Sequence, residues 1–181
     1  MAFEAGAQGA WRIERMETLV GAPLAPATFL DMTTGLASDA ATWRLRGATG
    51  AQRYTTRAEM QALGARQEGL GRPAATCAAL IPIRKTEQWW ALAQDERRAI
   101  VEEDSRHIAI GLGFLPAIAR RLHHCRELGE PFDFLTWFEF AREDAPAFDD
   151  LLARLRATAE WAYVDREIDI RLTRVDPPAL P

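Results

Sequence analysis

The order of strand-like and helical patterns from Ala75 to Leu172 constrains the fold more than any other feature of the chain. An apolar run at 75–83 predicts a buried strand, and alternating patterns at 118–125, 132–140 and 164–172 predict three more. Helical patterns lie between the first and second strands and between the third and fourth. The resulting order, β-α-β-β-α-β, predicts a ferredoxin-like arrangement, which is an antiparallel sheet with helices on one face, and therefore an α+β fold.

The helical segments of this half have recognisable ends. Thr86 is the predicted N-cap of a brief helix that carries two tryptophans. One uninterrupted helix is predicted from an N-cap at Asp95 to about Ile110, because the run lacks glycine and proline until Gly111. A last helix opens near Asp144. Its predicted apolar stripe consists of Phe148, Leu151, Leu152, Leu155 and Ala159.

The N-terminal part of the chain has a less regular pattern. Strands are predicted at 11–20 and 43–47 and a helix at 57–67, whereas residues 1–9 are expected to form a disordered tail. We therefore divide the chain into a reduced ferredoxin-like half at 1–73, a ferredoxin-like half at 74–174 and a tail at 175–181. The second sheet would cover the open face of the first, either packed on it or closed with it into a barrel.

Two residues of the C-terminal half are candidates for chemistry. His107 falls on the same helical stripe as Ile108 and looks inward, and Arg120 shares a strand face with Ile118 and Leu122. An inward histidine is more often a hydrogen-bonded core residue than a ligand. A buried guanidinium, however, must meet a carboxylate, a bound anion or a water-filled cavity. The pair therefore predicts either a core histidine or a cofactor pocket with a ligand below and a cation above.

Bulk properties exclude several classes of function. The 181 residues carry a net charge of −4 and no run of basic residues, so we expect no nucleic-acid partner. We also expect no signal peptide and no membrane span, since the most apolar N-terminal run is interrupted by Pro23 and Pro26. The two cysteines form neither a metal motif nor a disulfide framework, which predicts a reduced, cytoplasmic protein.

The chain resembles the chlorite dismutase family of heme proteins, and most of all its short, dimeric lineage. The resemblance is carried by the runs PIRKTEQWW, DERRAIVEEDSRHIAI, IARRLHHCRELGEPFDFLTWFEF and LRATAEWAYVDREIDIRL. It covers Arg66–Arg174 and, more faintly, Trp43–Tyr54. It implies a dimeric α+β barrel with heme b as cofactor, a homodimer, and chlorite as the substrate anion. The reaction implied converts chlorite to chloride and dioxygen through an oxoferryl/hypochlorite intermediate held by a distal arginine.

The resemblance also implies roles for individual residues. His107 matches the proximal ligand of the heme iron, and Glu160 matches the carboxylate that bonds the other ring nitrogen and raises the basicity of the ligand. Without the resemblance, Glu160 would be interpreted as a surface acid at a helix end. Arg120 matches the distal arginine, and Gln67 matches its distal polar partner.

Further positions match residues that surround the heme in the family. Thr136 and Phe138 correspond to the distal wall, which agrees with their shared strand face. Lys85 and Tyr54 match residues near a heme propionate, and Trp89 matches one that packs near the heme. For the tryptophan pair that includes Trp89, the alternative is plain packing in the core or at a subunit interface.

Two other functions remain open from the sequence. A coproheme decarboxylase-like or peroxidase-like protein of the same superfamily is one, but decarboxylases of that group lack the distal arginine and use a tyrosine near a propionate, so Arg120 disfavours it. A non-enzymatic heme-binding or structural α+β barrel protein is the other. His123 and His124 are interpreted as structural, because one faces away from Arg120 and the other lies far along the strand.

Overall fold

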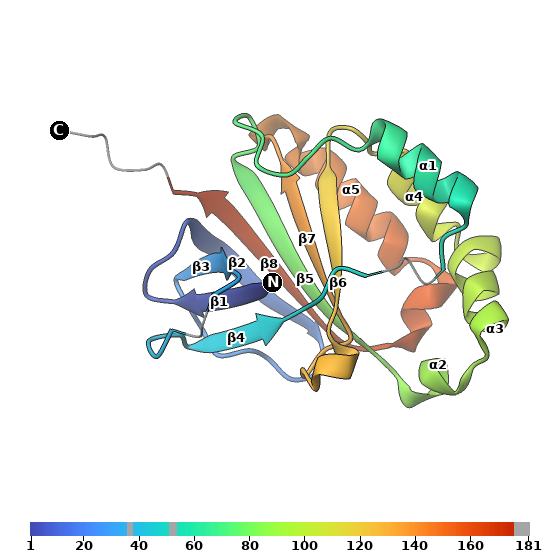
Figure 1. Ribbon diagram of the computed structural model, residues 1–181, viewed down its shortest axis with the longest axis horizontal. Coiled ribbons are helices and arrows are strands. Elements are labelled where there is room, and N and C mark those ends of the chain that lie inside the picture. The colour runs from blue at the N-terminus through green and yellow to red at the C-terminus, as the bar shows by residue number, and fades with distance from the viewer. Residues whose placement is uncertain (36–37, 51–53, 176–181) are drawn as a thin grey trace.

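The computed structural model describes residues 1–35, 38–50 and 54–175 of the chain. Helices lie on one side of a large twisted sheet, and short N-terminal strands lie on the other side (Figure 1). Except for Val175, the predicted tail at 175–181 lies outside the described residues. Among the residues described, no helix has the length and hydrophobicity that crossing a membrane would require.

The C-terminal half has the predicted ferredoxin-like order. Its strands are β5 (Cys77–Lys85), β6 (Ala119–His124), β7 (Phe134–Phe140) and β8 (Val164–Arg174). They hydrogen bond in the order β8-β5-β7-β6, and every pair is antiparallel. The fold class predicted from the order of patterns is confirmed.

The helices of this half are α2 (Glu87–Ala91), α3 (Gln94–Arg98), α4 (His107–Leu112) and α5 (Ala145–Arg156). Short 3-10 segments occupy 126–128, 142–144 and 159–163. The predicted cap of α2 is confirmed, since Thr86 Oγ1 accepts a hydrogen bond from Trp89 N–H at 3.3 Å.

Two predictions about helix ends are wrong. The N-cap of α3 is Ala93 rather than Asp95, because the Glu96 carboxylate accepts the Ala93 N–H at 2.6 Å and thereby starts the helix earlier. The stripe of α5 is buried at its other four positions, but Ala159 is exposed because the helix ends three residues before it and the chain continues as a 3-10 turn.

The described residues of the N-terminal half contribute four strands and one helix. These are β1 (Ala2–Gly6), β2 (Trp11–Val20), β3 (Phe29–Thr33), β4 (Trp43–Arg46) and α1 (Arg57–Arg66). The strands follow the order β4-β1-β3-β2, and β2 pairs with β8, so all the strands form one eight-stranded sheet. The predicted strands at 11–20 and 43–47 and the helix near 57–67 are confirmed.

The expectation of a disordered N-terminal tail is wrong. Strand β1 lies between β3 and β4, and the Phe3 side chain is fully buried. The flanking Ala2 and Ala5 are buried as well. Small residues suggested disorder in the sequence, but they are also what a strand at a crowded barrel wall needs.

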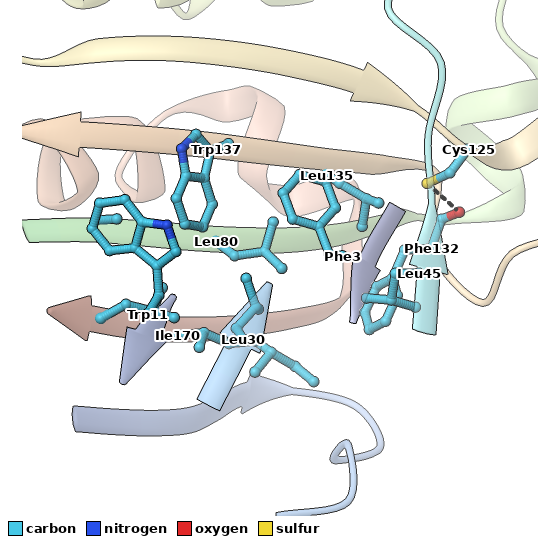
Figure 2. Packing of buried hydrophobic residues seen from close by; sticks show 13 residues of the cluster. Phe3, Trp11, Leu30, Leu45, Leu80, Cys125, Phe132, Leu135, Trp137 and Ile170 are labelled. Carbon is cyan, nitrogen blue, oxygen red and sulfur yellow. Dashed lines mark hydrogen bonds between the residues drawn. The ribbon is translucent and has the colours of Figure 1, made fainter. Parts of the chain in front are cut away.

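The sheet closes on itself near its two edges. Ala48, just beyond β4, exchanges two backbone hydrogen bonds of 2.9 Å with His124 of β6. The enclosed space is packed with side chains from both halves, and the rings of Trp11 and Trp137 meet edge to face at 5.3 Å (Figure 2). The interior is therefore a packed apolar core, and the cavity described below lies on the helix side of the sheet.

His123 is buried beneath this closure. Its side chain is 1% exposed, its ring lies edge-on to Phe3, and a Cβ at Gly47 would come within 2.5 Å of the His123 Cβ. Neither ring nitrogen makes a hydrogen bond of good geometry to a described residue. Burial lowers the pKa of the imidazole from 6.5 to about 4.

We expect His123 to make the fold acid-sensitive. The free energy of unfolding is highest above about pH 6.5, where the imidazole is neutral in both the folded and the unfolded chain. It falls as the pH drops towards 4, because the unfolded chain then binds a proton that the folded chain excludes. The loss amounts to roughly 2 kcal/mol at pH 4.5. Urea unfolding of the cofactor-free protein at pH 7 and 4.5 measures it. The variant His123→Leu should lose that part of the pH dependence, and an unchanged dependence would contradict the assignment.

Candidate active site

A cavity of about 330 Å³ lies between the helix-facing side of the sheet and the helices α1, α2, α4 and α5. Its volume falls within the range of small-molecule and cofactor sites. The structure brings together around it all the residues predicted for the site: Tyr54, Gln67, Lys85, Trp89, His107, Arg120, Thr136, Phe138 and Glu160.

Strands β6 and β7 form the floor of this cavity through alternate residues. The antiparallel register aligns these residues in cross-strand pairs: Arg120 with Phe138, Leu122 with Thr136, and His124 with Phe134. Ile81 of β5 pairs with Thr136 from the other side and so extends the cross-strand row of Leu122 and Thr136. The predicted faces of both strands are therefore confirmed. The paired rows are apolar except for Arg120, Thr136 and His124, and Arg121 also lines the cavity.

His107 reaches the cavity from a break in the helical segment. The predicted single helix from 95 to 110 is wrong, because a π-helical turn occupies 99–104 and Arg106 adopts a left-handed conformation with φ 54°. Helix α4 then begins at His107 itself. No glycine or proline marks the break, so the sequence pattern could not predict it; π-helical turns are frequent at functional sites.

The imidazole of His107 is held by Glu160. The Nδ1 and Oε2 atoms are 2.6 Å apart, although 53 residues separate the two positions in the chain. With Nδ1–H donated to the carboxylate, Nε2 carries a lone pair that is available to a metal. This carboxylate–imidazole pair is the arrangement that typically orients a metal-binding histidine.

Lys85 completes a buried triad with these two residues. Its Nζ donates to Glu160 Oε1 at 2.9 Å and to Glu160 O at 3.3 Å, and it lies 4.7 Å from the centre of the Trp89 ring. Burial alone raises the pKa of the Glu160 carboxyl, but the His107 and Lys85 partners outweigh burial and hold that pKa at about 2. The structure thus gives Lys85 a partner other than the expected heme propionate.

Arg120 is the cation on the sheet side of the cavity. Among the described residues its guanidinium has no carboxylate or hydrogen-bond partner, and burial lowers its pKa from the ordinary value. Its Cζ lies 3.9 Å from the position of a Cβ at Gly111, on the helix that begins with His107. Gln67 donates from Nε2 to the Arg120 backbone carbonyl at 2.8 Å, so the predicted contact is made with the main chain.

Tyr54 and Trp89 bring two unpaired donors to the cavity. Their rings meet edge to face at 5.9 Å, and neither the Tyr54 hydroxyl nor the Trp89 Nε1 has a partner among the described residues, although both atoms are buried. Tyr54 is anchored through its carbonyl by Arg98, which also pairs with Glu59 at 2.6 Å. Buried donors without partners are rare in proteins and indicate a missing acceptor.

These features fit a flat, mainly apolar cofactor that has an acidic edge and a metal at its centre. The floor of the cavity is apolar, His107 offers one nitrogen ligand, and the Tyr54 and Trp89 donors could meet carboxylates. In the part of the chain that the structure describes, no cluster of three or more His, Cys, Asp or Glu could hold a metal ion. A heme brings most of its iron ligands with it, so a single histidine such as His107 fits that cofactor.

Sequence reasoning missed two neighbours of the triad. Ser105 Oγ accepts a hydrogen bond from the Glu160 backbone N–H at 3.0 Å, and the Trp161 ring lies 5.5 Å from Lys85 Nζ. Both contacts join segments that are far apart in the chain, and neither residue lies on a periodic pattern that points to the site. No signal in the sequence alone could have identified them.

Comparison with known proteins assigns the family. A family model described as "Chlorite dismutase" matches residues 27–175. Among curated proteins, the chlorite dismutase of Ideonella dechloratans is 33% identical over 84 residues, which make up 46% of this chain and 27% of that protein. The match therefore spans about a quarter of the curated relative.

Solved structures agree with this assignment. A crystal structure of dimeric chlorite dismutase from Nitrobacter winogradskyi has a TM-score of 0.91 and 54% identity, and the match covers 96% of this chain and 99% of that one. The chlorite dismutase from Candidatus Nitrospira defluvii in complex with imidazole has a TM-score of 0.60 and 27% identity, covering 74% of this chain and 56% of that one. Since the family model matches well over half of the 181 residues of this chain, the chain belongs to the chlorite dismutase family.

Proposed function

We propose that the protein is a heme b-dependent chlorite dismutase, which converts one chlorite ion to one chloride ion and one dioxygen molecule. The observation that carries the proposal is that a carboxylate-bonded imidazole and an unpaired guanidinium border the same apolar cavity. Membership of the family and similarity to a dimeric chlorite dismutase support it.

On the His107 side, the protein's own residues would hold the iron. His107 would ligate through Nε2, while Glu160 fixes the ring and Lys85 keeps the Glu160 carboxylate charged. Tyr54 and Trp89 would place their free donors against the acidic edge of the porphyrin. Bound heme would supply an iron centre that can take an oxygen atom from chlorite and return it for O–O bond formation.

On the sheet side, Arg120 would bind the substrate anion. A permanent cation in an apolar pocket attracts an anion strongly, because the pocket screens charge poorly. Arg120 would also retain the chlorine oxyanion in the cavity until the new bond has formed. Thr136 and Phe138 would confine it from the distal wall.

We also propose that the protein is a homodimer in the cytoplasm. The dimeric state of the Nitrobacter winogradskyi protein, 54% identical to this chain, supports the first part. Cys77 and Cys125 are both free thiols, which supports a reducing compartment.

Reconstitution with hemin tests the proposal. We expect the loaded protein to evolve oxygen from chlorite, recorded with an oxygen electrode, and His107→Ala to lose the imidazole-ligated heme spectrum together with nearly all of this activity. His124→Ala is the matched control, since His124 borders the same cavity on the sheet side. A loaded protein that evolves oxygen no faster than free hemin would refute the proposal.

A coproheme decarboxylase-like activity is the second candidate. The buried Tyr54 hydroxyl, which has no partner among the described residues, favours it, because decarboxylases of the superfamily use a tyrosine near a propionate. Addition of peroxide to the coproheme-loaded protein, followed by analysis of the porphyrin products, distinguishes the two. Appearance of heme b would favour the decarboxylase, whereas the unpaired cation of Arg120 leads us to expect none.

A further inference from the structure

The backbone just before His107 adopts a conformation that a side chain disfavours. Arg106 has φ 54° and ψ 34°, in the left-handed region, and follows the π-helical turn at 99–104. Such a residue persists only where its surroundings hold it in place. The Arg106 backbone is held on both sides, since its N–H donates to Glu102 O at 3.1 Å and its carbonyl accepts from Ile110 N–H at 2.8 Å.

Two side chains add hydrogen bonds around this break. Glu102 Oε2 accepts the Ile108 N–H at 2.9 Å, which satisfies a free donor in the first turn of α4. Ser105, which is 5% exposed, accepts the Glu160 N–H at 3.0 Å through its hydroxyl. The first bond orients the helix that begins at His107, and the second joins the break to the segment that carries Glu160.

We propose that Ser105 and Glu102 are positioning residues that set the geometry of the His107–Glu160 pair. The bond from Glu160 N–H to Ser105 and the bond between the Glu160 and His107 side chains link the same two segments at 3.0 and 2.6 Å. One link alone would let the imidazole pivot about it. Two links, with Glu102 aligning α4, fix both the length and the direction of the His107 hydrogen bond.

The consequence for the iron rests on the proposed function. A short Nδ1–H bond to a carboxylate makes the imidazole a stronger donor, which favours ferric over ferrous iron. If Ser105 loses its hydroxyl, Glu160 is less well placed and this preference weakens. The midpoint potential of the bound heme should then rise.

The variant Ser105→Ala tests the proposal first in the cofactor-free protein. We expect the Nδ1 proton of His107, observed by NMR of ¹⁵N-histidine-labelled protein, to exchange with water several-fold faster than in the wild type. Asp104→Ala is the matched control, because Asp104 is the exposed neighbour of Ser105. Ser105→Thr keeps the hydroxyl and should restore slow exchange. Equal rates in Ser105→Ala and Asp104→Ala would overturn the proposal.

The heme-loaded protein provides the second measurement. For Ser105→Ala we expect the ferric preference to fall about threefold, which corresponds to a rise of roughly 30 mV at 59 mV per tenfold change. Glu102→Ala should shift the potential in the same direction, whereas its exposed neighbour Glu103 can be replaced without effect. Fast exchange in Ser105→Ala without any heme ligation by His107 would refute the proposed function but support this positioning role. Potentials that match the controls would overturn the role.

Discussion

Replacement of Glu160 by alanine is expected to destabilise the cofactor-free protein by about 3–5 kcal/mol, because it leaves a buried charge without its partner. The Lys85 ammonium is 3% exposed and has Glu160 as its carboxylate partner at 2.9 Å. The Trp89 ring beneath it would remain, but a cation–π contact cannot replace a charged hydrogen bond. Urea unfolding at pH 7 measures the loss.

An exposed ion pair of similar length serves as the control. Arg84 and Asp165 approach to 2.7 Å, yet both side chains are more than a third exposed, so Asp165→Ala should cost less than about 1 kcal/mol. Combining Lys85→Met with Glu160→Gln should recover part of the stability, since it removes the stranded charge. A loss for Glu160→Ala no larger than that for Asp165→Ala would show that the triad does not behave as a buried charge network.

Replacement of Arg120 by alanine is expected to lower the turnover of chlorite without lowering the stability of the fold appreciably. The guanidinium is partly buried and has no carboxylate or hydrogen-bond partner among the described residues, so its removal should leave the stability of the cofactor-free protein within about 1 kcal/mol of the wild type, or above it. Oxygen evolution from chlorite should fall roughly 10- to 100-fold in kcat/KM, because the anion loses its charged donor. Thermal unfolding and the oxygen electrode provide the two measurements.

Arg12 supplies the control for Arg120. It is an exposed arginine on β2, a strand that does not line the cavity, so Arg12→Ala should retain most of the turnover. Arg120→Lys keeps the charge without the planar donor set and should fall between the wild type and Arg120→Ala. An Arg120→Ala protein that is clearly less stable but turns over chlorite normally would identify the residue as structural.

The floor of the site was predictable from the sequence because strands obey a simple alternation. Spacing alone grouped Arg120 with Leu122 on one strand face and Thr136 with Phe138 on the next, the resemblance placed these faces at the site, and the register of β6 and β7 pairs them. The order of strands and helices in the C-terminal half followed from the same rules. Local periodicity was sufficient wherever the contact lay within one element or between adjacent strands.

The break before His107 and the role of β1 could not be predicted in this way. The break is bordered by hydrogen bonds that Glu102 and Ser105 accept, and the second of these comes from the Glu160 segment 55 residues away. Strand β1 is specified by its place between β3 and β4, which a short run of small residues does not reveal. Both features come from tertiary contacts that outweigh local propensity.

Glu160 shows what the resemblance added. Its position in the sequence is typical of a solvated acid at a helix end, but the structure buries it between His107 and Lys85. The family pattern predicted its contact with His107, but it also suggested a propionate for Lys85, where the structure has Glu160 instead. Residue matching thus gave the contact between Glu160 and His107 but not the one between Glu160 and Lys85.

The strands that form the cavity floor also form one wall of the barrel core, on their opposite face. On β6 and β7, Arg120 and Thr136 point to the cavity, while His123 and Leu135 point to the core. Insertion of one residue early in β6 would turn the following residues of β6 to the opposite face, so that Arg120 would point to the core and His123 to the cavity, while β7 would keep its faces. On the cavity face, Phe138 also packs against α5, whereas Thr136 belongs to neither buried cluster, so substitutions at Thr136 could vary the site while leaving the packing of both clusters in place.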